Sequence, residues 1–312
     1  MSSGTVGKLQ VRADELRSGR TPFVLATVVR AEKPASARPG DRALVLADGT
    51  IEGFVGGACA ESTTRVESLR VLSSGEPGLV RITPGGGSVD SPPGVRTVDN
   101  PCLSGGALEI FLEPVLPPAL VVVVGDAPVA KALVRVGEAL DHEVRVLDPD
   151  GEPAQTPPEL PPDVAGVVVA SHGRGEPAVL AAALHAGVPY VALVASRRRA
   201  AGVLAEVTAL GVPADAVARV HSPAGLDIAA RTPPEIALSI YAQFTAGRGT
   251  ERPAAGQLAA VPAAPAAVDP VCGMAVAPVP ASLSTEHAGA TVWFCGPGCR
   301  DAFRAEPRRY AS

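Results

Sequence analysis

The sequence has few aromatic residues, no excess of positive charge and no long apolar segment. Aromatic residues make up 3% of its 312 residues while hydrophobic residues make up 46%, so the core must consist mostly of Val, Leu and Ala. The net charge of -5 argues against a general nucleic-acid binder, whose binding surface would be basic. No apolar run approaches a membrane span, and the first residues lack the apolar core of a signal peptide. We therefore expect a cytoplasmic protein without a membrane span or a nucleic-acid partner.

Cysteine is also scarce, with five residues, three of which lie after residue 270. In a cytoplasmic chain they favour thiol chemistry or metal binding over a disulfide framework. A chain of this length can bury the cores of two or more domains. We predict an N-terminal α+β domain at 1–117, a Rossmann-like domain at 118–247, an Ala/Pro-rich linker at 248–267 and a small metal-binding module at 268–312.

The chain is organised around a strand, helix, strand unit at 119–150. Residues 120–124 are an uninterrupted apolar run, which is typical of a strand buried on both faces of a parallel sheet. Val129, Leu133, Val136 and Leu140 then recur at helical spacing, and 143–147 read as a second strand. The fold class that we predict is therefore α/β.

The phosphate loop of this unit departs from the dinucleotide-binding pattern. A G-x-G-x-x-G or G-x-G-x-x-A loop lets backbone amides approach a pyrophosphate, but here Gly125 is followed by Asp126 and Ala127. Asp126 brings negative charge to the place where phosphate would sit. Asp148 lies near the position of the ribose-binding acid, about 20 residues on, or is a solvated residue at a strand end. Gly125 and Asp148 remain candidates for cofactor binding, whereas ordinary NAD(P) binding is not expected.

Other candidate ligand groups of this domain follow predicted strands. His172 lies in the loop after the strand at 166–170, as a ligand or acid/base group or as a merely solvated residue. Arg197, Arg198 and Arg199 follow the strand at 190–194, together with Ser196, where they are suited to bind phosphate or form a solvated helix start. Cations are unfavourable at a helix N-terminus, which favours the anion-binding interpretation. Asp227 is a further candidate, in the loop at 221–227.

The N-terminal domain reads as a helix at 8–19 and strands at 23–30, 43–46 and through 54–55, with a later strand at 107–112. The polar loop at 32–41 either is a surface excursion or presents Arg38 and Arg42 to an anionic ligand. Cys59 follows Gly56 and Gly57 at the start of a helix, where the dipole favours a reactive thiolate. The alternative is a small buried residue beside a tight turn.

A second cysteine is also near a glycine pair: Cys102 precedes Gly105 and Gly106. Two such segments in one domain favour function over packing. Together with residues 26–30, the Gly-Gly-Ala-Cys-Ala-Glu segment and residues 102–114 resemble the XdhC/CoxI family of molybdenum-hydroxylase accessory factors. Residues 196–199, 225–228 and 232–240 continue the resemblance, which covers about residues 8–246.

This resemblance implies a factor that binds molybdenum cofactor, as molybdopterin or its dinucleotide, assists its sulfuration and delivers it to an apo molybdenum hydroxylase. A cysteine desulfurase and a second copy of the chain are the further partners that we expect. A dithiolene-bound metal suits soft thiolate ligands, so Cys59 and Cys102 are candidates for metal contact or sulfur handling. The spacing of both cysteines from their glycine pairs departs from the family pattern and suggests a divergent subgroup.

The tail resembles a YHS domain, a small metal-binding module, in residues 269–274 and 293–299 and at Phe303, Pro307 and Tyr310. Its three cysteines supply three thiolates, which suit Zn or Cu, and His287 or a partner residue is a candidate for the fourth ligand. The alternative is three buried thiols without a metal. Met274 is expected to be a packing residue and not a metal ligand. The candidate metal ligands are Cys272, Cys295, Cys299 and His287.

Three function classes follow from these readings. The first is a cofactor-insertion chaperone with little or no catalysis of its own. The second is an enzyme, either an NAD(P)-linked oxidoreductase, which the degraded glycine loop disfavours, or a sulfurtransferase using Cys59 or Cys102. The third is a heavy-metal binding protein that acts through the tail and leaves most of the chain unexplained.

Overall fold

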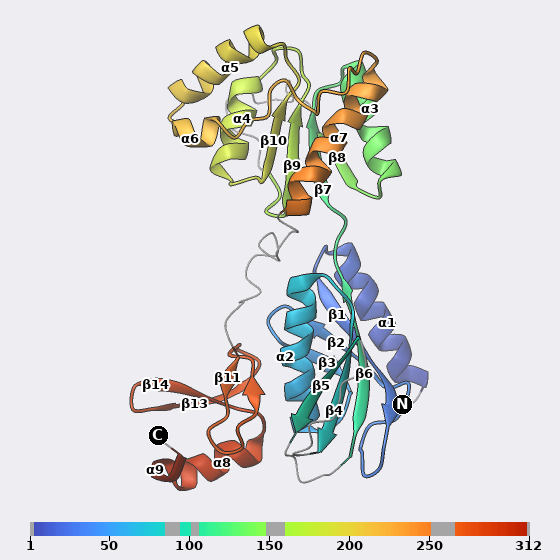
Figure 1. Cartoon of the computed structure of the whole chain (residues 1–312), viewed down its shortest axis with the longest axis vertical. Helices are drawn as coiled ribbons and strands as arrows, with labels where there is room; N and C mark the ends of the chain where they lie inside the picture. Colours follow the sequence, from blue (N-terminus) through green and yellow to red (C-terminus); the bar gives the residue numbers. More distant parts are fainter. Residues whose placement is uncertain (1–2, 85–93, 101–105, 148–159, 251–265, 311–312) are drawn as a thin grey trace. The chain divides into compact units, whose positions relative to one another are not determined.

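The computed structural model describes residues 3–84, 94–100, 106–147, 160–250 and 266–310. The chain divides into two compact units, of which the first joins residues 1–117 with 254–312 and the second comprises 118–253. The first unit holds a mixed α/β domain and the small C-terminal module, and the second is a Rossmann-like domain with a parallel sheet (Figure 1). The predicted fold class is confirmed. Among the described residues, no helix has the length and apolar composition that a bilayer crossing requires.

The N-terminal domain is built on a six-stranded sheet in the order β3-β2-β1-β6-β4-β5. Its neighbouring strands run antiparallel except for β4 and β5, which are parallel. Its elements are α1 (Ser3–Ser18), β1 (Phe23–Ala31), β2 (Arg42–Leu46), β3 (Ile51–Gly53), α2 (Ala58–Ser74), β4 (Gly78–Pro84), β5 (Val95–Asn100) and β6 (Leu108–Val115).

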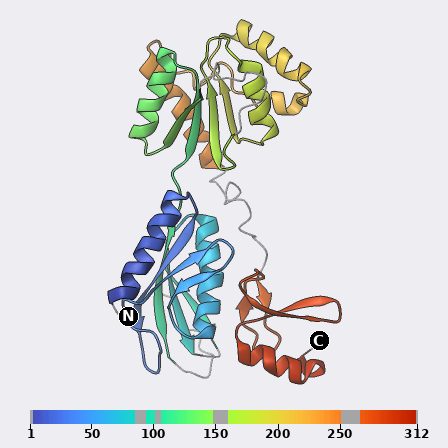
Figure 2. The same ribbon diagram turned by 180° about the vertical axis from the view of Figure 1, so that it is seen from behind.

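Two helices cover opposite faces of this sheet (Figures 1 and 2). Strand residues alternate between the faces, so Val24 of β1 packs in one core with Leu72 of α2. The neighbouring residue Phe23 packs in a separate core with Leu16 of α1. Because successive side chains point to opposite faces, β1 contributes residues to both cores.

The sequence did not predict every strand of this domain. The strand expected through 54–55 is instead β3, which ends at Gly53. At Gly53 the backbone has φ +123°, and a Cβ would lie 2.5 Å from the carbonyl oxygen of Arg42, so the chain leaves the extended conformation at a position that requires glycine. Strands β4 and β5 were not predicted, because their parallel pairing is not revealed by local sequence pattern.

The second unit contains a four-stranded parallel sheet in the order β10-β9-β7-β8. Helices α3 and α7 cover one face, and α4 and α5 cover the other (Figure 1). Val123 of β7 packs toward α3 and α7, and Val124 packs toward α4 and α5, as expected for a strand buried on both faces. The elements are β7 (Leu120–Val124), α3 (Pro128–Ala139), β8 (Glu143–Leu147), β9 (Val164–Val169), α4 (Glu176–His185), β10 (Tyr190–Leu193), α5 (Arg197–Ala209), α6 (Ala214–Val217) and α7 (Pro233–Thr250).

Gly137 is a small residue that lets α3 approach α7. A Cβ at this position would lie 2.2 Å from the Tyr241 hydroxyl and 2.5 Å from Val144 Cγ2. The Tyr241 hydroxyl donates a hydrogen bond to the Leu133 carbonyl at 3.0 Å, which holds it in place. We expect Gly137→Ala to lower the free energy of unfolding by about 1–3 kcal/mol through overpacking, measured by chemical denaturation.

Gly202 on α5 is the matched control for this substitution. No atom lies within 4 Å of a Cβ placed there, so Gly202→Ala should gain about 0.5–1 kcal/mol from helix propensity alone. Equal effects of the two substitutions would contradict the close packing of α3 against α7.

The C-terminal module consists of two short antiparallel strand pairs and two helices, and lies in the first unit. Val279 of this module packs with Leu69 of α2, and the turn at Gly49 approaches the same valine. The outer side of α2 therefore carries the module. Its elements are β11 (Ala267–Val268), β12 (Ala275–Val276), β13 (Leu283–His287), β14 (Ala290–Phe294), α8 (Pro297–Ala305) and α9 (Pro307–Tyr310).

Candidate functional site

A pocket of about 280 Å³ lies in the N-terminal domain beside the start of α2. Gly57 and Cys59 line it from one side, and Asn100 and Gly106 line it from the second glycine-rich segment. The two segments that the sequence paired by pattern thus meet at one cavity. Cys102 and Gly105 lie outside the described residues.

Cys59 is the second residue of α2, after the N-cap residue Gly57. The N-cap is extended, with φ -74° and ψ 179°, and has no side chain that caps the helix. The first amides of a helix and its dipole attract negative charge. The pocket is therefore suited to an anionic or thiophilic ligand, and Cys59, which is not in a disulfide, is placed to contact it.

Two of the predicted glycines are required by close packing. Gly56 has φ +136°, and a Cβ there would lie 2.8 Å from Ala60 Cβ. A Cβ at Gly106 would lie 2.3 Å from the Pro34 carbonyl oxygen. Arg38 is exposed and does not line the pocket, and its backbone amide donates to the buried Asp41 carboxylate at 2.8 Å.

The second candidate site is the switch point of the Rossmann-like sheet. The chain passes from β7 to β8 on one side and returns to β9 on the other, and ligands bind such sheets at the carboxyl ends of these strands. Gly125 ends β7 with φ +113°, and a Cβ there would lie 2.7 Å from the Ala170 carbonyl oxygen. The glycine is needed for packing between β7 and β9.

Asp126 forms an ion pair with Arg174, from the loop that follows β9. The carboxylate thus lies at the switch point, opposite a guanidinium group that would otherwise suit a phosphate. Both side chains are exposed, so we expect the pair to add little to stability. The pair gives the aspartate of this loop a partner.

Replacing Asp126 with glycine should remove from the phosphate loop the carboxylate that pairs with Arg174. We expect about tenfold tighter binding of ADP by Asp126→Gly than by the natural chain. The substitution removes the negative charge that repels phosphate, and Asp126 no longer neutralises the Arg174 cation. Isothermal titration calorimetry measures it, and Asp141→Gly, which removes an exposed carboxylate after α3, is the control. Equal ADP binding by all three proteins would contradict the expectation that Asp126 hinders phosphate binding.

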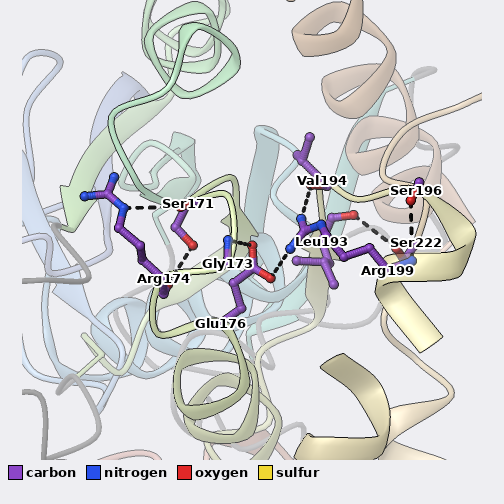
Figure 3. Close-up of polar contacts among 9 residues, drawn as sticks. All are labelled: Ser171, Gly173, Arg174, Glu176, Leu193, Val194, Ser196, Arg199 and Ser222. Atoms are coloured by element: carbon purple, nitrogen blue, oxygen red, sulfur yellow. Dashed lines mark hydrogen bonds and ion pairs between the residues drawn. The ribbon is translucent and has the colours of Figure 1, made fainter. Parts of the chain in front are cut away.

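Arg199 was expected to bind phosphate together with Arg197 and Arg198. In the structure it instead pairs with another residue of the domain. Its guanidinium group pairs with Glu176, whose side chain is 1% exposed, and donates to the Val194 carbonyl at 2.9 Å (Figure 3). The other Glu176 oxygen accepts the Gly173 amide at 2.8 Å. Burial of the carboxylate required a cation, and Arg199 supplies it. Arg197 and Arg198 are exposed at the start of α5 and remain candidates.

The remaining predicted groups of this domain lie in loops. Ser196 is the N-cap of α5 and accepts the Arg199 amide at 3.4 Å, which gives it a structural role. His172 is exposed with φ 53°. Asp227 is exposed, and its carboxylate accepts the Ala229 amide at 3.4 Å. Asp148 lies outside the described residues.

The third site is the cysteine cluster of the C-terminal module. The Sγ atoms of Cys272 and Cys295 lie 3.5 Å apart, and those of Cys295 and Cys299 lie 3.7 Å apart. A tetrahedral zinc ion with Zn–S bonds of about 2.3 Å holds its thiolates about 3.8 Å apart. The sulfur spacing therefore fits one thiophilic metal ion.

Asp269 is a fourth group in this cluster that the sequence reasoning missed. One carboxylate oxygen and the three sulfur atoms lie within 4.8 Å of one another. The only local signal was its position three residues before Cys272. His287, the predicted fourth ligand, is not in the group; its ring lies edge-on to Phe303, 5.3 Å between centroids. Met274 is buried and packs in the apolar cluster beside the cysteines.

Burial raises the pKa of the Cys295 and Cys299 thiols, and the neighbouring Cys272 and Asp269 add to the effect. Deprotonating these thiols in the buried cluster therefore requires a compensating positive charge, which a bound metal ion would supply.

Three family models match the chain in the order found in the structure. The XdhC and CoxI family model matches residues 16–83, the XdhC Rossmann domain matches 121–244, and the YHS domain matches 267–312. The chain carries XdhC and YHS domains. The resemblance to the XdhC/CoxI family and to a C-terminal YHS domain, inferred from sequence motifs, is thereby confirmed.

The chain is also similar to the uncharacterized protein YqeB of Escherichia coli K12. The two are 27% identical over 251 residues, which cover 74% of this chain and 44% of YqeB. The chain thus spans less than half of this relative. A crystal structure described as a xanthine dehydrogenase from Bacillus halodurans aligns with 80% of this chain and 97% of its own, at 17% identity and a TM-score of 0.37.

Proposed function

We propose that this chain is a cytoplasmic maturation factor for a molybdenum hydroxylase of the xanthine or carbon monoxide dehydrogenase type. It binds molybdenum cofactor, as molybdopterin or its dinucleotide, assists its sulfuration and delivers it to the apo-enzyme. The matches to the XdhC and CoxI family and to the XdhC Rossmann domain support this role. The proposed partners are the apo-enzyme, a cysteine desulfurase and a second copy of the chain.

The observation that carries this proposal is the pocket at the start of α2. Its volume of about 280 Å³ is near the lower end of the range for small-molecule sites. The amides at the start of α2 would suit an anionic group of the cofactor, and the Cys59 thiolate would offer a soft ligand to its metal. When bound, the cofactor supplies a redox-active molybdenum centre, which only the client enzyme uses.

Cys59 also suits sulfur transfer in this scheme. Its thiolate attacks the outer sulfur of a desulfurase persulfide, the sulfur–sulfur bond breaks, and the desulfurase cysteine leaves as thiolate. The chain then carries the sulfur as a Cys59 persulfide. In the second unit, the exposed Arg197 and Arg198 at the start of α5 form a separate candidate site for a phosphate group.

The test is reconstitution of an apo molybdenum hydroxylase with free cofactor, with and without this chain. We expect faster recovery of activity with the natural chain, and at least a tenfold smaller gain with Cys59→Ala. Direct titration with cofactor separates binding from delivery: Arg198→Ala should weaken binding of the dinucleotide form, and Arg135→Ala, an exposed arginine on α3, should not. No effect of the chain on reconstitution would refute the proposal.

A second candidate function is binding of a thiophilic metal by the YHS module. The spacing of its three sulfur atoms favours it. Zn and Cu are the metals expected for such a ligand set. Metal content after deletion of residues 268–312 tests it, because a metal that remains bound in the shortened chain must lie elsewhere.

A further inference from the structure

Cys59 lies beside the cysteine cluster of the YHS module as well as at the N-terminal pocket. It packs against the buried group formed by Met274, Val276 and Cys295, as do Cys272 and Cys299. The start of α2 approaches the start of α8: a Cβ placed at Gly296 would lie 3.5 Å from Ala58 Cβ. Four of the five cysteines of the chain therefore gather at one place, although they come from two domains.

Asp269 is engaged in holding the loops of this cluster. One carboxylate oxygen accepts the Val271 amide at 2.9 Å, and the other accepts the Cys295 amide at 2.8 Å. The residue is fully buried, and its backbone pairs with Met274. Both oxygens thus fix the backbone that positions two of the thiols. A metal ion that drew one oxygen away would weaken this support.

Three thiols at tetrahedral spacing leave one ligand position of a zinc-like ion to be filled. The candidates are the Asp269 carboxylate, which is already hydrogen-bonded, and the Cys59 thiol, which packs against the cluster but lies outside the group whose ligand atoms are within 4.8 Å of one another. A thiophilic ion binds thiolate more strongly than carboxylate. A side-chain rotation of Cys59 is a small change compared with breaking a buried hydrogen bond of Asp269.

We propose that Cys59 supplies the fourth thiolate to the metal ion of the YHS module, so that the metal joins the start of α2 to the module. This inference rests on the metal site proposed above as the second candidate function. It also links that site to the first, because a Cys59 thiolate bound to metal is not available to the pocket. The ion would then control whether Cys59 can contact a cofactor or receive sulfur.

The experiment measures the sulfur coordination of Zn²⁺ bound to the full-length chain by X-ray absorption. We expect four sulfur ligands in the natural chain, and three sulfur ligands with one lighter ligand in Cys59→Ser. Competition with a chelator should show a loss of Zn²⁺ affinity of at least about 100-fold in Cys59→Ser, more than outer-shell substitutions cause. Circular dichroism establishes that the variant is folded.

Alkylation gives a second readout in the unmodified sequence. Iodoacetamide should label Cys59 in the metal-free chain, and equimolar Zn²⁺ should protect it, as measured by peptide mass spectrometry. Three sulfur ligands in the natural chain, with the same Zn²⁺ affinity in Cys59→Ser, would overturn the inference and leave the YHS metal site standing. Failure of the natural chain to bind Zn²⁺ would overturn both.

Discussion

Replacing Glu176 with glutamine is expected to lower the free energy of unfolding by about 3 kcal/mol. The Glu176 side chain is 1% exposed, and its two oxygens bind the Arg199 guanidinium group and the Gly173 amide. The neutral amide keeps the shape but removes the charge and turns one acceptor into a donor that faces a cation. Breaking a buried ion pair costs about 3–5 kcal/mol, and the partly exposed Arg199 places the effect at the lower end.

Chemical denaturation followed by circular dichroism measures this loss. Glu138→Gln is the matched control, because Glu138 is exposed on α3 of the same domain and should change stability by less than about 0.5 kcal/mol. If both substitutions had the same small effect, Glu176 would not be the buried anchor that fixes the start of α5.

Replacing Asp269 with alanine is expected to disrupt the YHS module and its metal binding. Two backbone amides, of Val271 and Cys295, would lose their acceptor in a buried place. Each buried unsatisfied donor costs about 1–3 kcal/mol. The cysteines that these amides position would lose their spacing, so we expect Zn²⁺ affinity to fall by about 10–100-fold or more.

Trp293 gives a local measure of this effect, because it is the one tryptophan of the sequence and packs against the cysteine cluster. Its fluorescence in the natural chain should change on unfolding of the module, and in Asp269→Ala it should already resemble the unfolded state. Asp301→Ala is the control, since that carboxylate is 67% exposed on α8. Native Trp293 emission with unchanged Zn²⁺ affinity in Asp269→Ala would contradict the structural role.

The sequence was sufficient to predict the elements whose burial is set locally. Residues 120–124 are apolar at every position, and β7 has these bounds because a strand between two helical layers must be apolar on both faces. Residues 143–147 likewise form β8. The thiol group of the YHS module was predicted from cysteine spacing: Cys295 lies just before α8 and Cys299 in its first turn, with their Sγ atoms 3.7 Å apart.

The groups that were missed depend on contacts between distant parts of the chain. The Glu176–Arg199 pair joins the starts of two helices, and nothing near Arg199 in the sequence indicates that a buried carboxylate needs it. The Asp126–Arg174 pair joins two strand ends in the same way. Asp269 reaches Cys295 only after the module folds. Local pattern identifies which residues are chemically able to form a site, and tertiary contacts decide which of them do.

The most direct test of the proposed function is the cofactor content of the chain purified from a molybdenum-replete host. The chain is denatured, the released pterin is oxidised and its fluorescence is measured together with molybdenum. We expect close to one pterin per chain, falling at least tenfold in Cys59→Ala while Ser73→Ala, near the other end of α2 and outside the pocket lining, retains it. Absence of pterin from the natural chain, even after incubation with free cofactor, would contradict the proposal.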